Sequence, residues 1–195
     1  MIKVNEIFYS VQGEGCFTGV PSVFIRFSKC NLKCPFCDTD FQDFKAMTEK
    51  QIVDEVYRLG KDARHVVITG GEPTLQLTDT LCDLLHQYGY EIEIETNGTN
   101  KVSEKVDFVT CSPKFEYCQG AELKVERIDQ LKVVYDGKND MSRYNDIKAK
   151  HRCLQPCDTG DRKKNKEILS ATISYCLAHP QWNISLQIQK ILNVR

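Results

Sequence analysis

Residues 65–73 read HVVITGGEP, a short and nearly continuous apolar run that ends in two glycines, a glutamate and a proline. Such a run is typical of a β-strand covered on both faces, as strands are in parallel sheets. Strand-like and helix-like segments alternate on either side of it, which favours a parallel α/β fold. Strands are expected over residues 23–27, 65–69, 91–95, 108–110, 131–135, 153–155 and 184–188, and helices over 48–59, 81–88, 140–150 and 167–178.

The length of the chain limits the architecture. Eight strand–helix units of a closed barrel take about 250 residues, and this chain has 195. We therefore expect a single domain over residues 1–195, built as a partial (β/α) barrel of about six mainly parallel strands. A doubly wound sheet is the competing architecture. In both, functional sites gather at the carboxyl ends of the strands.

Composition excludes several classes of protein. Apolar residues make up 41% and charged residues 27%, as in a soluble globular domain. No stretch approaches the roughly 18 apolar residues that span a membrane. The net charge of −1 lacks the basic excess of a nucleic-acid-binding protein, and the basic residues 162–164 are interpreted as a helix start. From these two observations we expect neither a membrane nor a nucleic-acid partner. The first residues contain no apolar signal segment, so we expect a cytoplasmic location.

Three of the ten cysteines lie in the segment CNLKCPFC, residues 30–37, directly after an expected strand. In a reducing compartment, clustered cysteines are more often metal ligands than disulfides. Thiolates select zinc, copper(I) or iron–sulfur clusters. A structural zinc site takes four ligands, and only three are local here. A cubane iron–sulfur cluster on three cysteines would leave one iron open to a small molecule. The other cysteines are expected to be small buried hydrophobic residues, and the histidines to be structural: Cys16, Cys82, Cys111, Cys118, Cys153, Cys157 and Cys176; His65, His86, His151 and His179.

The C-x3-C-x2-C spacing, with Phe36 just before the last cysteine, resembles the cluster motif of the radical S-adenosylmethionine (SAM) superfamily. The GGEP segment after the 65–69 strand is similar to the segment that lies near the SAM amino group in that superfamily. Two glycines allow a backbone to approach a ligand closely. The resemblance implies a fold of the radical SAM type and a [4Fe–4S] cluster. It also implies that reductive cleavage of SAM yields a 5′-deoxyadenosyl radical. The implied cluster ligands, which are also the catalytic residues, are Cys30, Cys34 and Cys37.

A narrower resemblance covers nearly the whole chain, from about residue 4. It is carried by EIFYSVQGEG (6–15), CDTD (37–40), ETNG (95–98), CSPK (111–114), ELK (122–124) and LQP (154–156). These segments resemble the 7-carboxy-7-deazaguanine synthase family. That family implies a carbon–nitrogen lyase that converts 6-carboxy-5,6,7,8-tetrahydropterin to 7-carboxy-7-deazaguanine and ammonia in deazapurine and queuosine biosynthesis. It also implies Mg²⁺, an external one-electron donor such as flavodoxin, and a homodimer.

The same resemblance implies roles for individual residues. Arg26 would meet the substrate carboxylate through charge-assisted hydrogen bonds, and Glu14 would accept from the guanidine-like edge of the pterin. The implied magnesium ligand is Thr39, whose hydroxyl supplies the oxygen that magnesium prefers. The implied SAM-binding residues are Phe36, Asp38, Gly71, Glu72, Ser112, Pro113, Lys114, Gln155 and Asp158. The implied substrate-binding residues are Gln12, Gly13, Glu14, Arg26, Thr69 and Arg195.

The chain departs from the pattern near its end. Related enzymes can carry a histidine where this chain has Gln189, so a titrating contact would become a neutral amide. The chain ends in Arg195 where a proline is familiar, and we expect Arg195 to act through its main chain only.

Two other classes of function stay open at this point. One is a radical SAM activase that installs a glycyl radical on a partner protein. The other is a zinc-binding module without enzymatic activity, using the three cysteines and Cys157 or a histidine. The zinc module predicts bound zinc and no iron, and the activase predicts a large protein partner.

Overall fold

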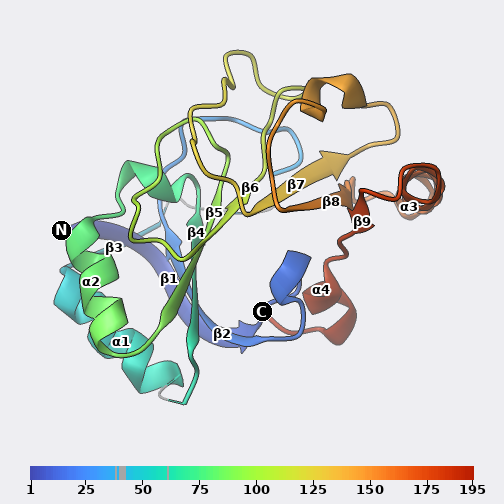
Figure 1. Ribbon diagram of the computed structural model, residues 1–195. Helices are drawn as coiled ribbons and strands as arrows, with labels where there is room; N and C mark the ends of the chain where they lie inside the picture. The colour runs from blue at the N-terminus through green and yellow to red at the C-terminus, as the bar shows by residue number, and fades with distance from the viewer. Residues whose placement is uncertain (38, 40–42, 61) are drawn as a thin grey trace.

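The computed structural model describes residues 1–37, 39, 43–60 and 62–195. A single sheet of nine strands forms its centre, in the order β3-β1-β2-β4-β5-β6-β7-β8-β9 (Figure 1). The strands are β1 Ile2–Val11, β2 Pro21–Phe27, β3 Lys45–Met47, β4 His65–Gly70, β5 Glu91–Thr96, β6 Phe108–Cys111, β7 Gln130–Tyr135, β8 His151–Pro156 and β9 Asn183–Ile184.

The sheet is parallel from β2 through β9 and antiparallel where β1 pairs with β2 and β3. Strands β3 and β9 form its two edges, so the sheet does not close. The expected α/β class with a mainly parallel, partial barrel is confirmed. The expected number of about six strands is too low. Strands β1 and β3 are not among the expected strands, because their segments have neither a continuous apolar run nor a regular alternation of apolar and polar residues.

Among the described residues, four α-helices and three 3₁₀ helices complete the fold. Helices α1 and α2 lie side by side against the sheet, whereas α3 lies beside β8 and β9 (Figure 1). Their bounds are α1 Glu49–Gly60, α2 Asp79–Gln87, α3 Arg162–Ala178 and α4 Ile188–Leu192; η1 Gly15–Phe17, η2 Pro73–Leu75 and η3 Met141–Tyr144.

Three expected elements differ in extent. The helix expected over 140–150 is only the short η3, because Asp140 accepts from the amide of Ser142 and closes a tight turn. The strand expected over 184–188 is cut to β9, and α4 begins at Ile188. The helix expected over 167–178 begins earlier, at Arg162, because Asp161 caps its first turn. The basic residues 162–164 therefore start a helix, as predicted.

Alternation of side chains along the strands divides the sheet into two unlike faces. Ile68 of β4 and Ile94 of β5 are fully buried in the main core, beneath the helices. Their neighbours Thr69 and Glu95 point to the opposite face and line a cavity. The outer face of the sheet, which packs against the helices, thus belongs to the hydrophobic core, whereas the inner face, which lines the cavity, is largely polar. In the described part of the chain, no helix is long and apolar enough to cross a membrane.

Truncation of a central core residue tests this division. We expect Ile94→Ala to lower the free energy of unfolding by about 2–5 kcal/mol, because the truncation leaves a cavity that the neighbouring core side chains cannot fill. Ile191→Ala, on an exposed position of α4, is the control and should change it by less than about 0.5 kcal/mol. Urea denaturation followed by circular dichroism measures both. Equal effects would contradict the assignment of the outer face as the core.

Candidate functional site

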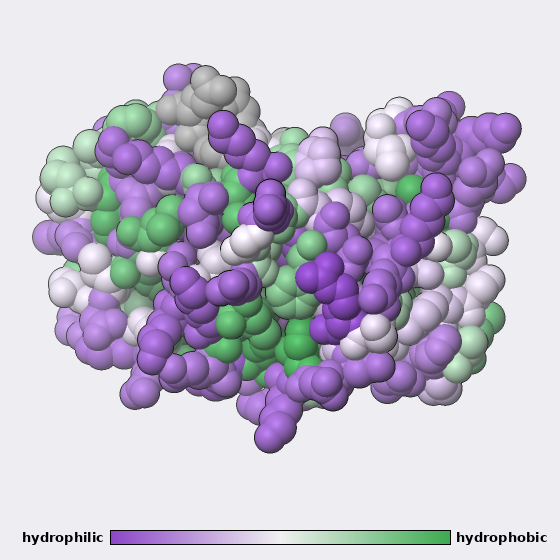
Figure 2. All heavy atoms as spheres, turned by 90° about the horizontal axis from the view of Figure 1, so that it is seen from above, coloured by the Kyte–Doolittle hydropathy of each residue, from purple (hydrophilic) through white to green (hydrophobic). Residues whose placement is uncertain are grey.

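A cavity of about 1030 Å³ lies on the polar inner face, at the carboxyl ends of the strands. The loop after β2, the strand ends and the segment around α4 all contribute to its wall. The view from above shows apolar side chains in the middle of one face, with hydrophilic side chains on either side (Figure 2). Most of the residues that the sequence singled out meet in this cavity: Gln12, Gly13, Glu14, Arg26, Cys30, Cys34, Phe36, Cys37, Thr39, Thr69, Gly71, Ser112, Lys114, Gln155, Asp158 and Arg195.

The cysteine loop brings three thiols to one wall. Cys30 Sγ accepts from the amide of Leu32 at 3.4 Å, and Cys37 Sγ lies 3.7 Å from the carbonyl oxygen of Thr39. Three soft donors within eight residues, all lining the same cavity, suit a four-iron cluster, in which three irons would each take one thiolate and the fourth would stay open to a small molecule. In the described residues, no group of three or more His, Cys, Asp or Glu side chains is placed so that it could hold a metal ion. The thiolate chemistry and the shared cavity of the three cysteines fit an iron–sulfur group.

Hydrogen bonds to the strand end of β4 hold this loop in place. The amide of Glu72 donates to the carbonyl oxygen of Lys29 at 2.9 Å, and the amide of Gly71 donates to Phe27 at 3.1 Å. A Cβ on Gly71 would overlap the main chain of Lys29 and lie 2.8 Å from the amide nitrogen of Cys30. Only glycine therefore allows the GGEP segment to lie against the cysteine loop.

Glu72 itself is fully buried and does not line the cavity. Its carboxylate accepts from the amide and hydroxyl of Thr74, the hydroxyl of Thr96 and the amide of Asn97, at 2.6 to 3.1 Å. These bonds tie the end of β4 to the end of β5. The structure thus places Glu72 as a brace behind the cavity wall, whereas Gly71 faces the cavity.

Cys118 is a residue whose position the sequence did not indicate. It is half-buried, and its Sγ lies 3.7 Å from Cys34 Sγ. Its loop is fixed by Tyr117, whose ring packs edge-on against Phe36 at 4.6 Å. The expectation of a buried hydrophobic cysteine is wrong for Cys118 and Cys176, which are half-buried, and for Cys16, which is exposed because it lies on the short η1 turn. It is confirmed for Cys82, Cys111, Cys153 and Cys157. Burial raises the pKa of Cys34 to about 12.

The residues expected to hold SAM are spread over the ends of β6 and β8. Lys114 Nζ donates to the carbonyl and hydroxyl oxygens of Ser112 at 2.6 Å, and burial lowers the pKa of Lys114. Gln155 accepts from Ser185, and Asp158 pairs with Lys190 at 2.7 Å. Pro113 is buried and is not part of the cavity lining. Asp38 lies outside the described residues.

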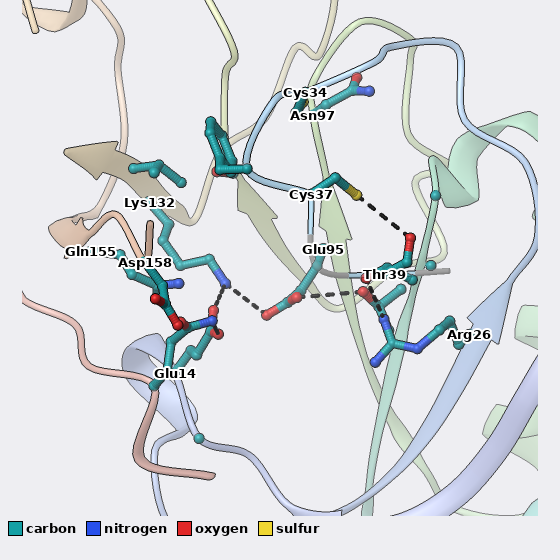
Figure 3. A pocket seen from close by; sticks show the side chains of 18 of the residues that line it. Glu14, Arg26, Cys34, Cys37, Thr39, Glu95, Asn97, Lys132, Gln155 and Asp158 are labelled. Atoms are coloured by element: carbon teal, nitrogen blue, oxygen red, sulfur yellow. Dashed lines mark hydrogen bonds and ion pairs between the residues drawn. The ribbon is translucent and has the colours of Figure 1, made fainter. Parts of the chain in front are cut away.

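One end of the cavity holds a buried cation between two carboxylates. Lys132 Nζ lies 2.6 Å from Glu14 Oε2 and 2.9 Å from Glu95 Oε1 (Figure 3). The other oxygen of Glu14 accepts from the amides of Gln187 at 2.9 Å and Gln189 at 3.1 Å. Burial alone would raise the pKa of Glu14, but the charge and hydrogen bonds of Lys132 hold it at about 2.

A third carboxyl, that of Glu93, is buried behind the cavity lining and contacts this group through Gln12. Glu93 is 1% exposed, and burial together with the charge of Glu95 raises its pKa to about 7. Gln12 bridges Glu93 and Glu95 through its amide nitrogen, at 3.2 and 3.4 Å, and its carbonyl accepts from the amide of Glu14. Gln12 is thus oriented by groups at both ends of its side chain.

The other end of the cavity is positively charged. Arg26 Nε lies 2.9 Å from Glu6, and Arg26 NH1 donates to the hydroxyl of Thr39 at 3.4 Å. Arg195 NH2 lies 2.7 Å from the same Glu6, and its main-chain oxygen accepts from Ser10 at 2.6 Å. The side chain of Arg195 thus contributes charge as well, although only a main-chain role was expected.

Comparison with known proteins identifies the family. Residues 24–109 match the radical SAM superfamily. A 7-carboxy-7-deazaguanine synthase of Bacteroides thetaiotaomicron is 47% identical over 195 residues, covering all of both chains, and that of Nitratidesulfovibrio vulgaris is 38% identical, covering 98% of each. The chain belongs to the 7-carboxy-7-deazaguanine synthase family. It is therefore a radical SAM lyase with a ring-contracting role in the queuosine pathway, and its cofactors are a [4Fe–4S] cluster, SAM and Mg²⁺.

Solved structures agree with this membership. The crystal structure of QueE from Escherichia coli has a TM-score of 0.76 and 30% identity, and covers 95% of this chain and 93% of that chain. SuiB of Streptococcus suis, bound to its precursor peptide, shares only the fold, with a TM-score of 0.52 and 16% identity. The expectations for family, fold class, activity and cofactors of this 7-carboxy-7-deazaguanine synthase family member are confirmed.

The close approach of Gly71 to the cysteine loop can be tested by adding one methyl group. We expect Gly71→Ala to displace the main chain around Cys30 and to reduce the iron bound per chain after anaerobic reconstitution. Gly120→Ala is the control, because no atom lies within 4 Å of its new Cβ, although its positive φ adds about 1–2 kcal/mol of strain. Iron and sulfide analysis and visible absorbance measure the outcome. Full iron content in Gly71→Ala would contradict the packing argument.

Proposed function

We propose that this cavity binds 6-carboxy-5,6,7,8-tetrahydropterin between its two charged ends and converts it to 7-carboxy-7-deazaguanine with release of ammonia. One observation carries the assignment of residues. The side chains of Glu14, Glu95 and Lys132 carry one net negative charge, whereas the side chains of Arg26, Arg195 and Glu6 carry one net positive charge. A substrate with hydrogen-bond donors at one end and a carboxylate at the other complements both ends.

The negative end suits the pyrimidine edge of the pterin. This edge presents the 2-amino group and a ring N–H as donors, and carboxylates accept such bonds strongly. Glu14 stays ionised across the physiological range because its pKa is about 2. Gln12, Gly13 and Thr69 line the same region and complete the proposed substrate site.

The positive end suits the substrate carboxylate. Arg26 is half-buried and its guanidinium can donate to a carboxylate as a planar fork. Thr39 lies next to it, so its hydroxyl oxygen and the substrate carboxylate are proposed to share the Mg²⁺, which prefers oxygen ligands. Arg195, beside Glu6, adds charge and closes this end.

The remaining wall is proposed to hold the cluster on Cys30, Cys34 and Cys37. When bound, the cluster and SAM supply the one-electron chemistry that activates the substrate. This chain's part is to bind and orient. The residues proposed to hold SAM in the order of the chain are Phe36, Asp38, Gly71, Ser112, Pro113, Lys114, Gln155 and Asp158, with Glu72 bracing the segment that carries Gly71.

Several wider assignments also belong to the proposal. The chain forms one domain over residues 1–195 and acts in the cytoplasm. Its iron–sulfur cluster receives an electron from an external donor such as flavodoxin. A homodimer is proposed as well. It is supported by a stripe on α3 where Leu169, Ile173 and Leu177 recur at helical spacing and stay exposed.

The activity is tested by anaerobic reconstitution and incubation with SAM, a reductant, Mg²⁺ and the carboxylated tetrahydropterin. Mass spectrometry should detect 7-carboxy-7-deazaguanine and ammonia without net loss of SAM. Cleavage of SAM with an untouched pterin would overturn the substrate assignment.

Removal of the proposed carboxylate contact should weaken substrate binding. We expect Arg26→Met to raise the substrate Kd by about 10- to 100-fold, from the roughly 1.5–3 kcal/mol of a hydrogen bond to a charged group. Arg58→Met is the control, because Arg58 pairs with Glu55 at 2.7 Å on the exposed face of α1. Titration of the anaerobic holoenzyme measures both. An unchanged Kd in Arg26→Met would place the carboxylate elsewhere.

A further inference from the structure

Lys132 is a lysine of the cavity wall whose charge is enclosed by two carboxylates. Its side chain is 6% exposed, at the centre of β7, and it meets Glu14 from the N-terminal loop and Glu95 from β5 (Figure 3). The three residues lie 37 and 118 positions apart in the sequence. Burial would lower the pKa of Lys132, but the two carboxylate charges raise it well above its usual value.

The donors of the ammonium group are only partly used. An ammonium has three N–H donors, and the two carboxylates take two of them. In the described part of the chain no further protein acceptor for Lys132 is found. Lys132 also lines the cavity, so the remaining donor is available to a bound ligand.

The three side chains together offer two hydrogen-bond acceptors, Glu14 and Glu95, and one donor, Lys132. The pyrimidine edge of a pterin offers the complementary number of groups: two donors, the 2-amino group and the ring N–H, and one acceptor, the 4-oxo group. A buried site whose polar groups all find partners rejects an analogue that leaves one of them unpaired.

We propose that Lys132 is a specificity-determining residue, which holds Glu14 and Glu95 as paired acceptors and donates its free N–H to the 4-oxo group of the substrate. The inference rests on the proposed function, because it names which part of the pterin each group recognises. It makes the 4-oxo group, and not only the carboxylate, a requirement for binding.

The test compares two ligands that differ at the 4-position and, as a consequence, at N3, which carries a hydrogen only in the 4-oxo ligand. Pterin-6-carboxylate carries the 4-oxo group, and 2,4-diaminopteridine-6-carboxylate carries an amino group there. Fluorescence titration of the anaerobic holoenzyme, with SAM and Mg²⁺ present, should show about 10- to 100-fold tighter binding of the 4-oxo ligand. A 4-amino group cannot accept from the ammonium of Lys132, and its hydrogens would face that positive charge.

Substitution of Lys132 should remove this preference. In Lys132→Met we expect the ratio of the two Kd values to fall by about 10-fold or more, because the 4-oxo group loses its donor and the unpaired carboxylates favour the extra amino donor. Lys132→Arg keeps a donor and should retain part of the preference. Lys150→Met is the matched control, because Lys150 pairs with the buried Asp129 at 2.7 Å and is not part of the cavity lining.

A second variant guards against a folding defect. Lys132→Met leaves Glu14 and Glu95 buried without their cation, which destabilises a fold. The double variant Glu95→Gln/Lys132→Met removes one charge of each sign, and thermal unfolding confirms that it is folded. It too should lose the preference for the 4-oxo ligand.

The outcomes separate this inference from the proposed function. Equal binding of both ligands by the unchanged protein, or a retained preference in Lys132→Met and in the double variant, would overturn the role of Lys132. Failure of the unchanged protein to bind pterin-6-carboxylate, together with no product from the tetrahydropterin, would instead overturn the proposed function.

Discussion

Successive side chains of each parallel strand point to opposite faces of the sheet, and the rest of the molecule depends on this alternation. Each strand presents one set of side chains to the helices and the other to the concave face. Ile68 and Ile94 therefore lie in the core, while Thr69 and Glu95, one position further on, line the cavity. A shift of one residue in any strand would exchange these faces. Fold stability and site composition are thus set by the same pattern.

The open sheet leaves its polar inner face accessible to ligands. Because β3 and β9 do not meet, the inner face is accessible, and the N-terminal loop, the cysteine loop and the segment around α4 close over it. Gly71 and Glu72 connect the sheet to the cysteine loop through hydrogen bonds to Phe27 and Lys29. The site where a cluster would bind is therefore anchored to the most buried strands of the fold.

Local sequence patterns predicted much of this organisation. The buried run at 65–69 identified β4, and the tight spacing of Cys30, Cys34 and Cys37 identified a common metal-binding loop, because each signal is contained within a few residues. Strands β1 and β3 were missed because they form an antiparallel edge with mixed burial. The helix expected over 140–150 failed because the turn chemistry of Asp140 outweighed the helical pattern.

The sequence by itself determined the fold class, the segments that end at the cavity and the chemical class of the cysteine loop. These depend on periodicity and spacing, which are read along the chain. Only the tertiary structure decided that Lys132 meets Glu14 and Glu95, that Cys118 faces Cys34, and that Glu72 braces the wall from behind. Such pairings join residues 24 to 118 positions apart, and strand order and burial alone bring them together.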